Sequence, residues 1–222
     1  MTSADVLWVI VLVIALDTST PAVTAGLVAV ADGHARSLAE RVTVNPRAHG
    51  ELLMPHLLDA MTEAGHELSD VDAVVVGSGP GPFTGLRVGM VTAAALGQAL
   101  DRPVHPVCSL DAIAAQAATG APLLVATDAR RKEVYWAAYD ADGTRRTGPE
   151  VRRPEDVPTD GLAAAAGEMA GRFGLDVVDV SYPTPVGLVT AADLSAAPQP
   201  LSPLYLRRPD AQAPGPRKQV AR

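Results

Sequence analysis

The segment Val71–Leu100 constrains this chain more than any other part of its sequence. An apolar run typical of a buried strand enters a loop with four glycines, and a helix of mostly small residues follows. Glycines at such a turn often let a backbone approach an anion at the helix N-terminus. However, no lysine follows the loop, and Pro80 and Pro82 remove two N–H donors that a phosphate would need. The loop indicates either an anion cradle made by the N–H groups of residues 83–85, or a tight turn after which Arg87 pairs with an acidic group of a partner.

The helix expected over residues 84–100 has a stripe of small residues at four-residue spacing: Gly85, Gly89, Ala93 and Gly97. Each glycine costs about 1 kcal/mol relative to alanine inside a helix, so a packing requirement must offset it. Small residues on one stripe let two backbones approach closely. The stripe therefore predicts a close neighbour, which is either an element of the same domain or a second subunit.

Composition excludes several classes of protein. A net charge of −7 leaves no basic surplus for an RNA-binding face, and an aromatic content of 4% offers no stacking platform. A partner would therefore supply most of any contact with RNA. The single cysteine, Cys108, excludes an internal disulfide and a cysteine metal cluster, which suits the reducing cytoplasm.

The N-terminal run Val6–Leu16 consists of apolar residues only. It is too short for a membrane-spanning helix. A secretory signal would carry basic residues before the run, where Asp5 stands. We expect residues 11–16 to form a buried first strand and residues 1–10 to be a disordered extension, with a signal peptide as the alternative.

Hydrophobic periodicity predicts an α/β chain of two halves. Strands are expected over residues 11–16, 23–30, 36–44, 73–76, 103–107, 123–127, 133–139 and 177–180. Helices are expected over residues 47–64, 84–100, 110–118 and 162–173, with a surface connection at 144–160. Pro55 should kink the first helix or mark a restart, and Ser109 is a good N-cap for the third. The expected division is a first domain at 11–108, a smaller second domain at 109–206 and a flexible tail at 207–222.

Five motifs in a specific order extend from about residue 13 to residue 207. They are ALDTSTP (Ala15–Pro21), RAHGELLMP (Arg47–Pro55), GSGPGPFTGLRVG (Gly77–Gly89), DARRKEVY (Asp128–Tyr135) and PLYLR (Pro203–Arg207). Each motif alone is weak, but in this order and spacing they are specific. The chain resembles the bacterial TsaB (YeaZ) family of tRNA threonylcarbamoyladenosine (t6A) biosynthesis proteins.

The resemblance implies the fold of the actin-like/sugar kinase/Hsp70 superfamily: two actin-like (ribonuclease H-like) α/β domains, the second smaller and degenerate. It also implies a cytoplasmic, non-catalytic scaffold. Its partner would be a TsaD-type catalytic subunit that transfers a threonylcarbamoyl group to adenosine 37 of tRNAs reading ANN codons. A TsaE-type ATPase would complete the complex. This chain would reach tRNA only indirectly, through the complex, and no association with a membrane is expected. The same surface can form a homodimer.

The resemblance further implies an interface on the two helices of the first domain. The residues expected at this partner or dimer interface are His49, Leu52, Leu53, His56, Leu57, Gly85, Arg87, Gly89, Met90, Ala93 and Gly97. The small-residue stripe would then pack against the partner.

A degenerate phosphate loop is expected at Asp17, Thr18, Ser19, Gly79, Gly81 and Thr84. Working members of the superfamily usually have a glycine after the aspartate, where this chain has Thr18. The alternative interpretation is a polar turn whose side chains bond nearby backbone groups. We expect no cofactor, except a nucleotide at a composite interface with the partner. An independent ATPase or phosphotransferase of the superfamily remains the alternative function.

No metal site or catalytic residue is expected. TsaD-like subunits hold a metal with H-x-x-x-H, whereas here Leu53 stands four residues after His49. A peptidase, the third alternative, lacks a metal-activated water or a nucleophile–base pair. Asp128 and Arg130 are expected to hold the domain junction by an ion pair or backbone hydrogen bonds.

Overall fold

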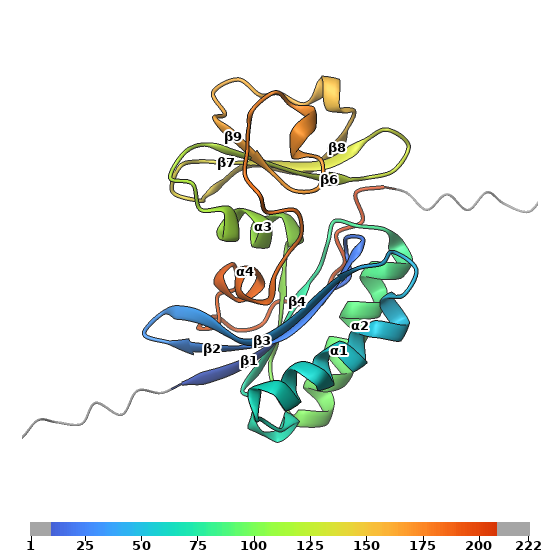
Figure 1. Ribbon diagram of the computed structural model, residues 1–222, viewed down its shortest axis with the longest axis vertical. Coiled ribbons are helices and arrows are strands. Elements are labelled where there is room, and N and C mark those ends of the chain that lie inside the picture. The colour runs from blue at the N-terminus through green and yellow to red at the C-terminus, as the bar shows by residue number, and fades with distance from the viewer. Residues whose placement is uncertain (1–9, 208–222) are drawn as a thin grey trace, which may run out of the picture.

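The first sheet has five strands in the order β3-β2-β1-β4-β5 in the computed structural model, which describes residues 10–207 (Figure 1). Its strands are β1 (Val11–Asp17), β2 (Ala22–Ala31), β3 (His34–Val44), β4 (Ala73–Gly77) and β5 (Val104–Val107). The first three strands are antiparallel, whereas β1, β4 and β5 run parallel. The carboxyl ends of β1 and β4 therefore lie at the same edge.

The second sheet also has five strands, in the order β10-β9-β6-β7-β8. They are β6 (Leu123–Asp128), β7 (Val134–Tyr139), β8 (Arg145–Arg152), β9 (Ala164–Ala166) and β10 (Asp176–Val177). The strands β6, β7 and β8 are antiparallel, while β9 pairs in parallel with β6 and β10 pairs in parallel with β9.

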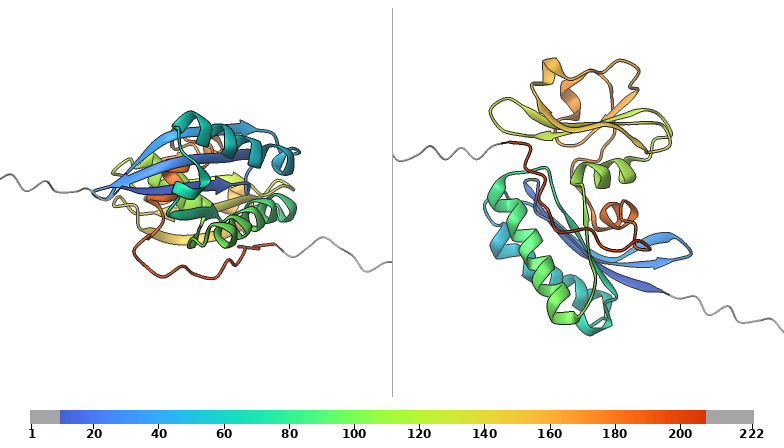
Figure 2. Two further views of the ribbon diagram at one scale, coloured as in Figure 1. Left: turned by 90° about the horizontal axis from the view of Figure 1, so that it is seen from below. Right: turned by 180° about the vertical axis from the view of Figure 1, so that it is seen from behind.

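Four α-helices complete the architecture of residues 10–207. They are α1 (His49–Ala64), α2 (Phe83–Leu100), α3 (Ser109–Ala117) and α4 (Pro185–Thr190), and 3₁₀ turns occur at Leu68–Asp70, Pro154–Asp156 and Ala170–Arg172. The helices α1 and α2 lie side by side on one face of the first sheet, while α3 and α4 lie between the two sheets (Figures 1 and 2).

The alternation of side chains in β1 shows why this sheet is covered on both faces. Ile14 and Leu16 pack in the core beneath α1 and α2. Val13 and Ala15 point to the other face and pack in the cluster that contains residues of α4. A strand buried on both faces reads as a continuous apolar run, which is the pattern seen in the sequence.

The chain returns to the first sheet after it has built the second. Residues 185–190 form α4, which packs against the first sheet, and the hydroxyl of Thr24 donates to the carbonyl of Pro183 at 2.9 Å. Gly26 permits this approach, because a Cβ there would lie 2.6 Å from Cγ of Pro185. The segment expected to belong wholly to a second domain at 109–206 thus contributes a helix to the first sheet.

Three predicted elements were wrong. Residues 162–173 do not form a helix: they contain β9, which pairs with β6, and a 3₁₀ turn. The expected surface connection at 144–160 contains β8. Ser109 does not cap α3, because the N-cap is Cys108 and the Ser109 hydroxyl donates to Asp17 instead.

Of the two alternatives at Pro55, a kink or a restart, the restart is absent, since α1 is one continuous helix. The predicted extension at 1–10 lies, except for Ile10, outside the described residues, as does the tail at 207–222 except for Arg207. No helix between residues 10 and 207 is both long enough and apolar enough to cross a bilayer.

Candidate functional site: the domain cleft and the outer face of α2

The carboxyl ends of strands from both sheets meet at one cleft. A hollow of about 190 Å³ opens there, lined by Thr20, His49 and Thr84 from the first domain and by Asp128 and Arg130 from the second. In open α/β sheets, ligands bind outside the carboxyl ends of the strands. The degenerate phosphate loop was predicted from the residues around this cleft.

Asp17 ends β1 and is fully buried. Its Oδ1 accepts from the backbone N–H and the hydroxyl of Ser19, both at 2.8 Å, and its Oδ2 accepts from the hydroxyl of Ser109 at 2.5 Å. Burial raises the pKa of Asp17, while the hydrogen bonds from Ser109 and Ser19 lower it. A Cβ at Gly77 would lie 1.7 Å from Oδ2, so β4 needs glycine beside this carboxyl group. Asp17 therefore ties three segments of the chain together.

Thr18 links the same loop to α2. Its hydroxyl donates to the carbonyl of Gly85 at 2.7 Å and accepts from the N–H of Gly89 at 2.9 Å. The side chains of Thr18 and Asp17 bond to groups of their own chain, as expected for a polar turn, which was the alternative to a phosphate loop. These side chains are engaged inside the chain rather than directed at the cleft.

The small-residue stripe of α2 packs against its own domain. A Cβ at Gly85 would lie 2.7 Å from the Thr18 carbonyl oxygen, one at Gly89 would lie 2.6 Å from Oγ1 of Thr18, and one at Gly97 would lie 2.2 Å from Cγ2 of Val104. Ala93 is fully buried in the core beneath the helix. The prediction that this stripe packs against a partner was therefore wrong.

The other predicted interface residues divide by the helix face they occupy. Leu53, Leu57 and Met90 are buried in the core of the first domain and do not face outward. Leu52 is partly buried, whereas Arg87 is exposed. The helical spacing of the apolar and small residues identified the face of each helix that is buried in its own domain. A partner could contact only the opposite, exposed face.

The loop before α2 contacts the loop after β1. A Cβ at Gly81 would lie 2.0 Å from the Ser19 carbonyl oxygen, so this approach requires glycine. Gly79 has a φ of +94°, a conformation that glycine adopts readily. Thr84 and Gly85 line the cleft hollow. The anion cradle at residues 83–85 stays a prediction.

The two histidines of α1 bond within the chain. His49 Nε2 lies 2.8 Å from the Thr20 carbonyl oxygen, and His56 Nε2 lies 2.9 Å from the Thr43 hydroxyl. Burial lowers the pKa of His56. Within residues 10–207, no three His, Cys, Asp or Glu side chains gather as metal ligands.

Arg87 bonds to the C-terminal segment of its own chain, and its pairing with an acidic group of a partner stays a prediction. Its Nε donates to the Tyr205 hydroxyl at 2.8 Å, and its guanidinium carbon lies 3.7 Å from the centroid of the Phe83 ring. The rings of Phe83 and Tyr205 stack with centroids 5.2 Å apart. The sequence analysis did not connect these residues, although Tyr205 belongs to the PLYLR motif.

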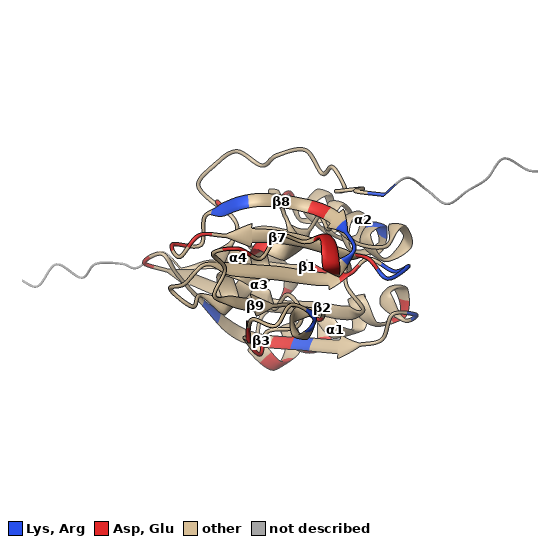
Figure 3. Ribbon diagram, turned by 90° about the horizontal axis from the view of Figure 1, so that it is seen from above, with Lys and Arg blue, Asp and Glu red and all other residues tan. Residues whose placement is uncertain are grey.

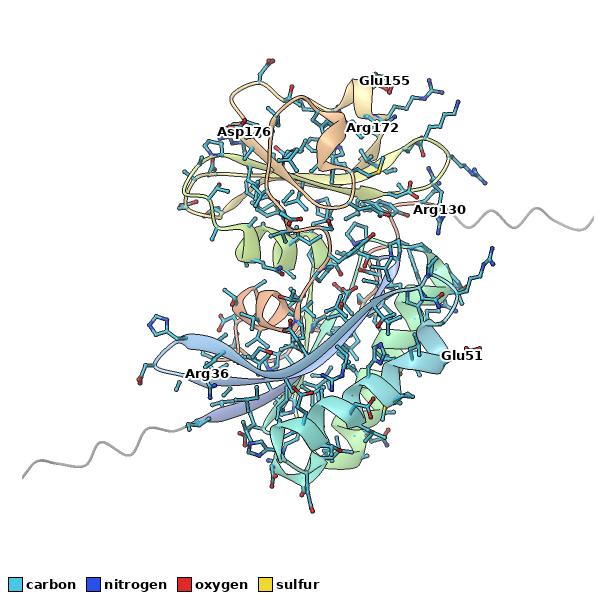
Figure 4. All side chains as sticks on the ribbon, in the orientation of Figure 1. Arg36, Glu51, Arg130, Glu155, Arg172 and Asp176 are labelled. Carbon is cyan, nitrogen blue, oxygen red and sulfur yellow. The ribbon has the colours of Figure 1, made fainter. Side chains whose placement is uncertain are left out.

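Asp128 and Arg130 bond to each other, not across the domain junction. The Arg130 N–H donates to Oδ1 of Asp128 at 2.8 Å, and the side chains form an ion pair at 3.8 Å. Arg207 donates to the Ala129 carbonyl at 2.7 Å and pairs with Glu133, which ties the C-terminal segment to the second domain. Figure 4 shows Arg130 beside the cleft.

The outer face of α2 is the feature that the sequence analysis missed. The helix has 18 residues and one charged residue, Arg87, although it lies at the surface (Figure 3). Val91 is 67% exposed, and on the neighbouring α1 Leu58 is 47% exposed. The outer face of α2 is thus low in charge and has an exposed apolar residue at its middle.

Comparisons with known proteins agree with this architecture. The family model for TsaD, tRNA N6-adenosine threonylcarbamoyltransferase, matches residues 38–197. An uncharacterised protein of Mycobacterium leprae is 57% identical over 205 residues, which cover 90% of this chain and 56% of that protein. The TsaB protein of Escherichia coli is 37% identical over 133 residues, 59% of this chain and 55% of the relative.

A solved structure extends the similarity over the whole fold. YeaZ from Pseudomonas aeruginosa superimposes with a TM-score of 0.71 and 32% identity, covering 88% of this chain and 100% of that one. This match supports the two-domain actin-like α/β fold that was expected. With the TsaD-family match over most of its length and the likeness to TsaB and YeaZ, the chain belongs to the TsaB/YeaZ family.

Proposed function

We propose that this protein acts in the formation of t6A on tRNA as a non-catalytic subunit. It binds a TsaD-type catalytic subunit and holds it in its active form, and a TsaE-type ATPase joins the pair. The observation that carries the proposal is the outer face of α2, an 18-residue surface helix with one charged residue. Such a face is expected to be covered in the working assembly.

The proposed interface consists of the outward residues of α2 and α1. Val91 is exposed in the middle of α2, with Ala94 and Ala95 exposed on the same side, and Leu58 is exposed on α1. A TsaD-type partner is itself related to this chain, so it would offer two equivalent helices. Helices with small outward residues pack closely against such a layer. The same surface would form the interface of a homodimer when the partner is absent.

The engaged polar groups support a role without its own catalysis. Asp17 accepts from Ser19 and Ser109, and Thr18 bonds to α2. A phosphate would have to displace these buried bonds, each of which contributes about 0.5–1.5 kcal/mol. A nucleotide would therefore be held only jointly with the partner, and an independent ATPase is disfavoured.

An omission reconstitution tests the proposal. A TsaC-type enzyme, which makes the threonylcarbamoyl-adenylate, is combined with TsaD-type and TsaE-type proteins, ATP, threonine, bicarbonate and an ANN-decoding tRNA. The product t6A is measured by mass spectrometry with and without this chain. Product that depends on the chain supports the proposal, whereas equal product without it refutes the proposal.

A further inference from the structure

A second hollow lies on the other side of the α2 N-terminus and has a distinct chemistry. It measures about 210 Å³, and we name it the arginine hollow after three of its lining residues, Arg130, Arg131 and Arg207. Phe83 and Tyr205 also line it, and among residues 10–207 no Asp or Glu lines it, although Asp128 pairs with Arg130 and Glu133 pairs with Arg207. Three arginines thus converge on one hollow of a chain whose net charge is −7.

Two exposed aromatic rings form one wall of this hollow. Phe83 is 45% exposed and Tyr205 is 40% exposed, and their rings stack at an interplanar angle of 24°. Arg87 holds the pair in place from one side, through its hydrogen bond to the Tyr205 hydroxyl and its position over the Phe83 ring. The low aromatic content had indicated that no stacking platform exists. The fold nevertheless builds one from residues far apart in the sequence.

The basic wall is presented by the turn between β6 and β7. Arg130, Arg131 and Lys132 have φ angles of 64°, 54° and 62°, a left-handed conformation that costs energy in residues other than glycine. The Arg130 side chain is 60% exposed. Arg207, at the far side, is fixed by Ala129 and Glu133. The guanidinium groups therefore stand beside the aromatic pair on a defined backbone.

Aromatic rings beside guanidinium groups match the chemistry of an unpaired nucleotide. A base stacks on an aromatic ring, and arginines bind the phosphates on either side. A volume of about 210 Å³ is below the roughly 300–1,000 Å³ of pockets that enclose a whole small ligand. The hollow therefore suits one unit of a longer strand.

We propose that the arginine hollow binds one unpaired nucleotide of the tRNA, with the base on the Tyr205 ring, which Phe83 and Arg87 support, and an adjoining phosphate on the exposed Arg130. The identity of the RNA rests on the proposed function. The contact is direct and local, whereas the sequence analysis expected tRNA to be reached only through the complex. The overall negative charge keeps this single contact weak in the isolated chain.

Fluorescence anisotropy of the isolated protein tests this contact. A labelled anticodon-loop RNA and a matching duplex are titrated at low salt. We expect the single strand to bind more tightly than the duplex, and Tyr205→Ser to weaken it about tenfold. Tyr205→Phe keeps the ring and should retain binding. Arg130→Glu should weaken binding and lower the salt dependence by about one ion.

Arg36→Glu is the matched control, because Arg36 is exposed on β3 far from the cleft (Figure 4) and undergoes the same change of charge. Thermal unfolding confirms that each variant is folded. The proposal is overturned if no RNA binds, if the duplex binds equally, if Mg-ATP competes as a tighter ligand, or if Tyr205→Ser and Arg130→Glu bind like Arg36→Glu.

The outcome is separable from that of the proposed function. Association with the TsaD-type subunit is measured on the same samples by size-exclusion chromatography. A chain that binds RNA in the expected manner but not the subunit retains the arginine hollow and refutes the scaffold role. A chain that binds the subunit but not RNA retains the scaffold role and refutes RNA binding at the arginine hollow.

Discussion

Thr18 accepts a hydrogen bond from the backbone N–H of Gly89 at 2.9 Å, and its hydroxyl also donates to the carbonyl of Gly85. A Cβ at position 89 would lie 2.6 Å from that hydroxyl oxygen. The glycine and the threonine are therefore matched to each other. This relationship explains why α2 has a glycine at position 89.

The match between Thr18 and Gly89 predicts coupled effects on stability. Gly89→Ala should lower the free energy of unfolding by about 1–3 kcal/mol, because the new methyl group overpacks the contact. In Thr18→Ala/Gly89→Ala the hydroxyl is gone, and the remaining Thr18 atoms lie at 3.6 Å or more from the position that the methyl group would take. Urea unfolding of both single variants and the double variant measures the coupling. Simple additivity would contradict it.

The outer face of α2 predicts how partner binding can be broken without unfolding the chain. Val91→Arg should reduce association with the TsaD-type subunit at least tenfold, because a charge replaces an exposed apolar residue at the proposed interface. Its effect on stability should stay within about 0.5 kcal/mol. Val177→Arg is the control, since Val177 is 62% exposed on β10, away from α2.

Pull-down with the tagged catalytic subunit, together with circular dichroism, measures this pair of variants. Full retention of the Val91→Arg variant on the subunit would refute the interface. Substitutions of Gly89 or Ala93 by arginine do not serve this purpose, because both positions are buried inside the chain.

The contrast between these residues shows what the sequence could predict. The spacing of Gly85, Gly89 and Gly97 correctly indicated a close neighbour, because a helix tolerates several glycines only where packing requires them. The spacing could not show whether this neighbour belongs to the same domain or to a second subunit. Arg87 is the one charged residue of α2, so the contrast of polarity that normally distinguishes the outer face of a helix from its inner face is weak.

The strands of the first sheet were predicted well because both faces of β1 and β4 are buried and their apolar runs are unbroken. The pairing of Tyr205 with Phe83 and Arg87 was beyond the sequence, since nothing local specifies where the C-terminal segment lies. Of the residues predicted to form a phosphate loop, Thr84 lines the hollow in the cleft. The sequence could not assign the role of Asp17, because a buried carboxyl group at this position can bond either to a ligand or to groups of its own chain.

The buried carboxyl group of Asp17 predicts a pH dependence of stability. Burial raises the pKa of Asp17 in the folded chain above the ordinary value of 3.8. Between the two pKa values the native state binds more protons than the unfolded state, so raising the pH favours unfolding. The stabilising contribution is complete below 3.8 and is lost as the pH rises through the folded pKa.

Asp17→Asn isolates this contribution. The amide oxygen can accept from Ser19, and the amide N–H can donate to the Ser109 hydroxyl. We expect the difference in the free energy of unfolding between wild type and variant to shift in favour of the variant as the pH rises from 4. Urea titrations across the pH range measure it. A difference that does not change with pH would show that Asp17 titrates at its ordinary value.

Gly167 distinguishes the observed structure of residues 162–173 from the helix that was predicted. In the structure its φ is +94°, and a Cβ would lie 2.2 Å from the carbonyl oxygen of Ala126 on β6. Gly167→Ala should therefore cost about 2–4 kcal/mol through strain and overpacking against backbone. In a helix the same change would stabilise by about 1 kcal/mol.

Gly171→Ala is the control in the same segment, because a Cβ at Gly171 would meet nothing within 4 Å. Its effect should lie within about 1 kcal/mol of zero, and stabilisation is the expected direction because alanine narrows the unfolded ensemble. Urea unfolding of the two variants gives the comparison. If both stabilised the chain equally, residues 162–173 would be helical and the pairing of β9 with β6 would be refuted. A large loss for Gly167→Ala alone would establish that the small second sheet depends on a glycine beside β6.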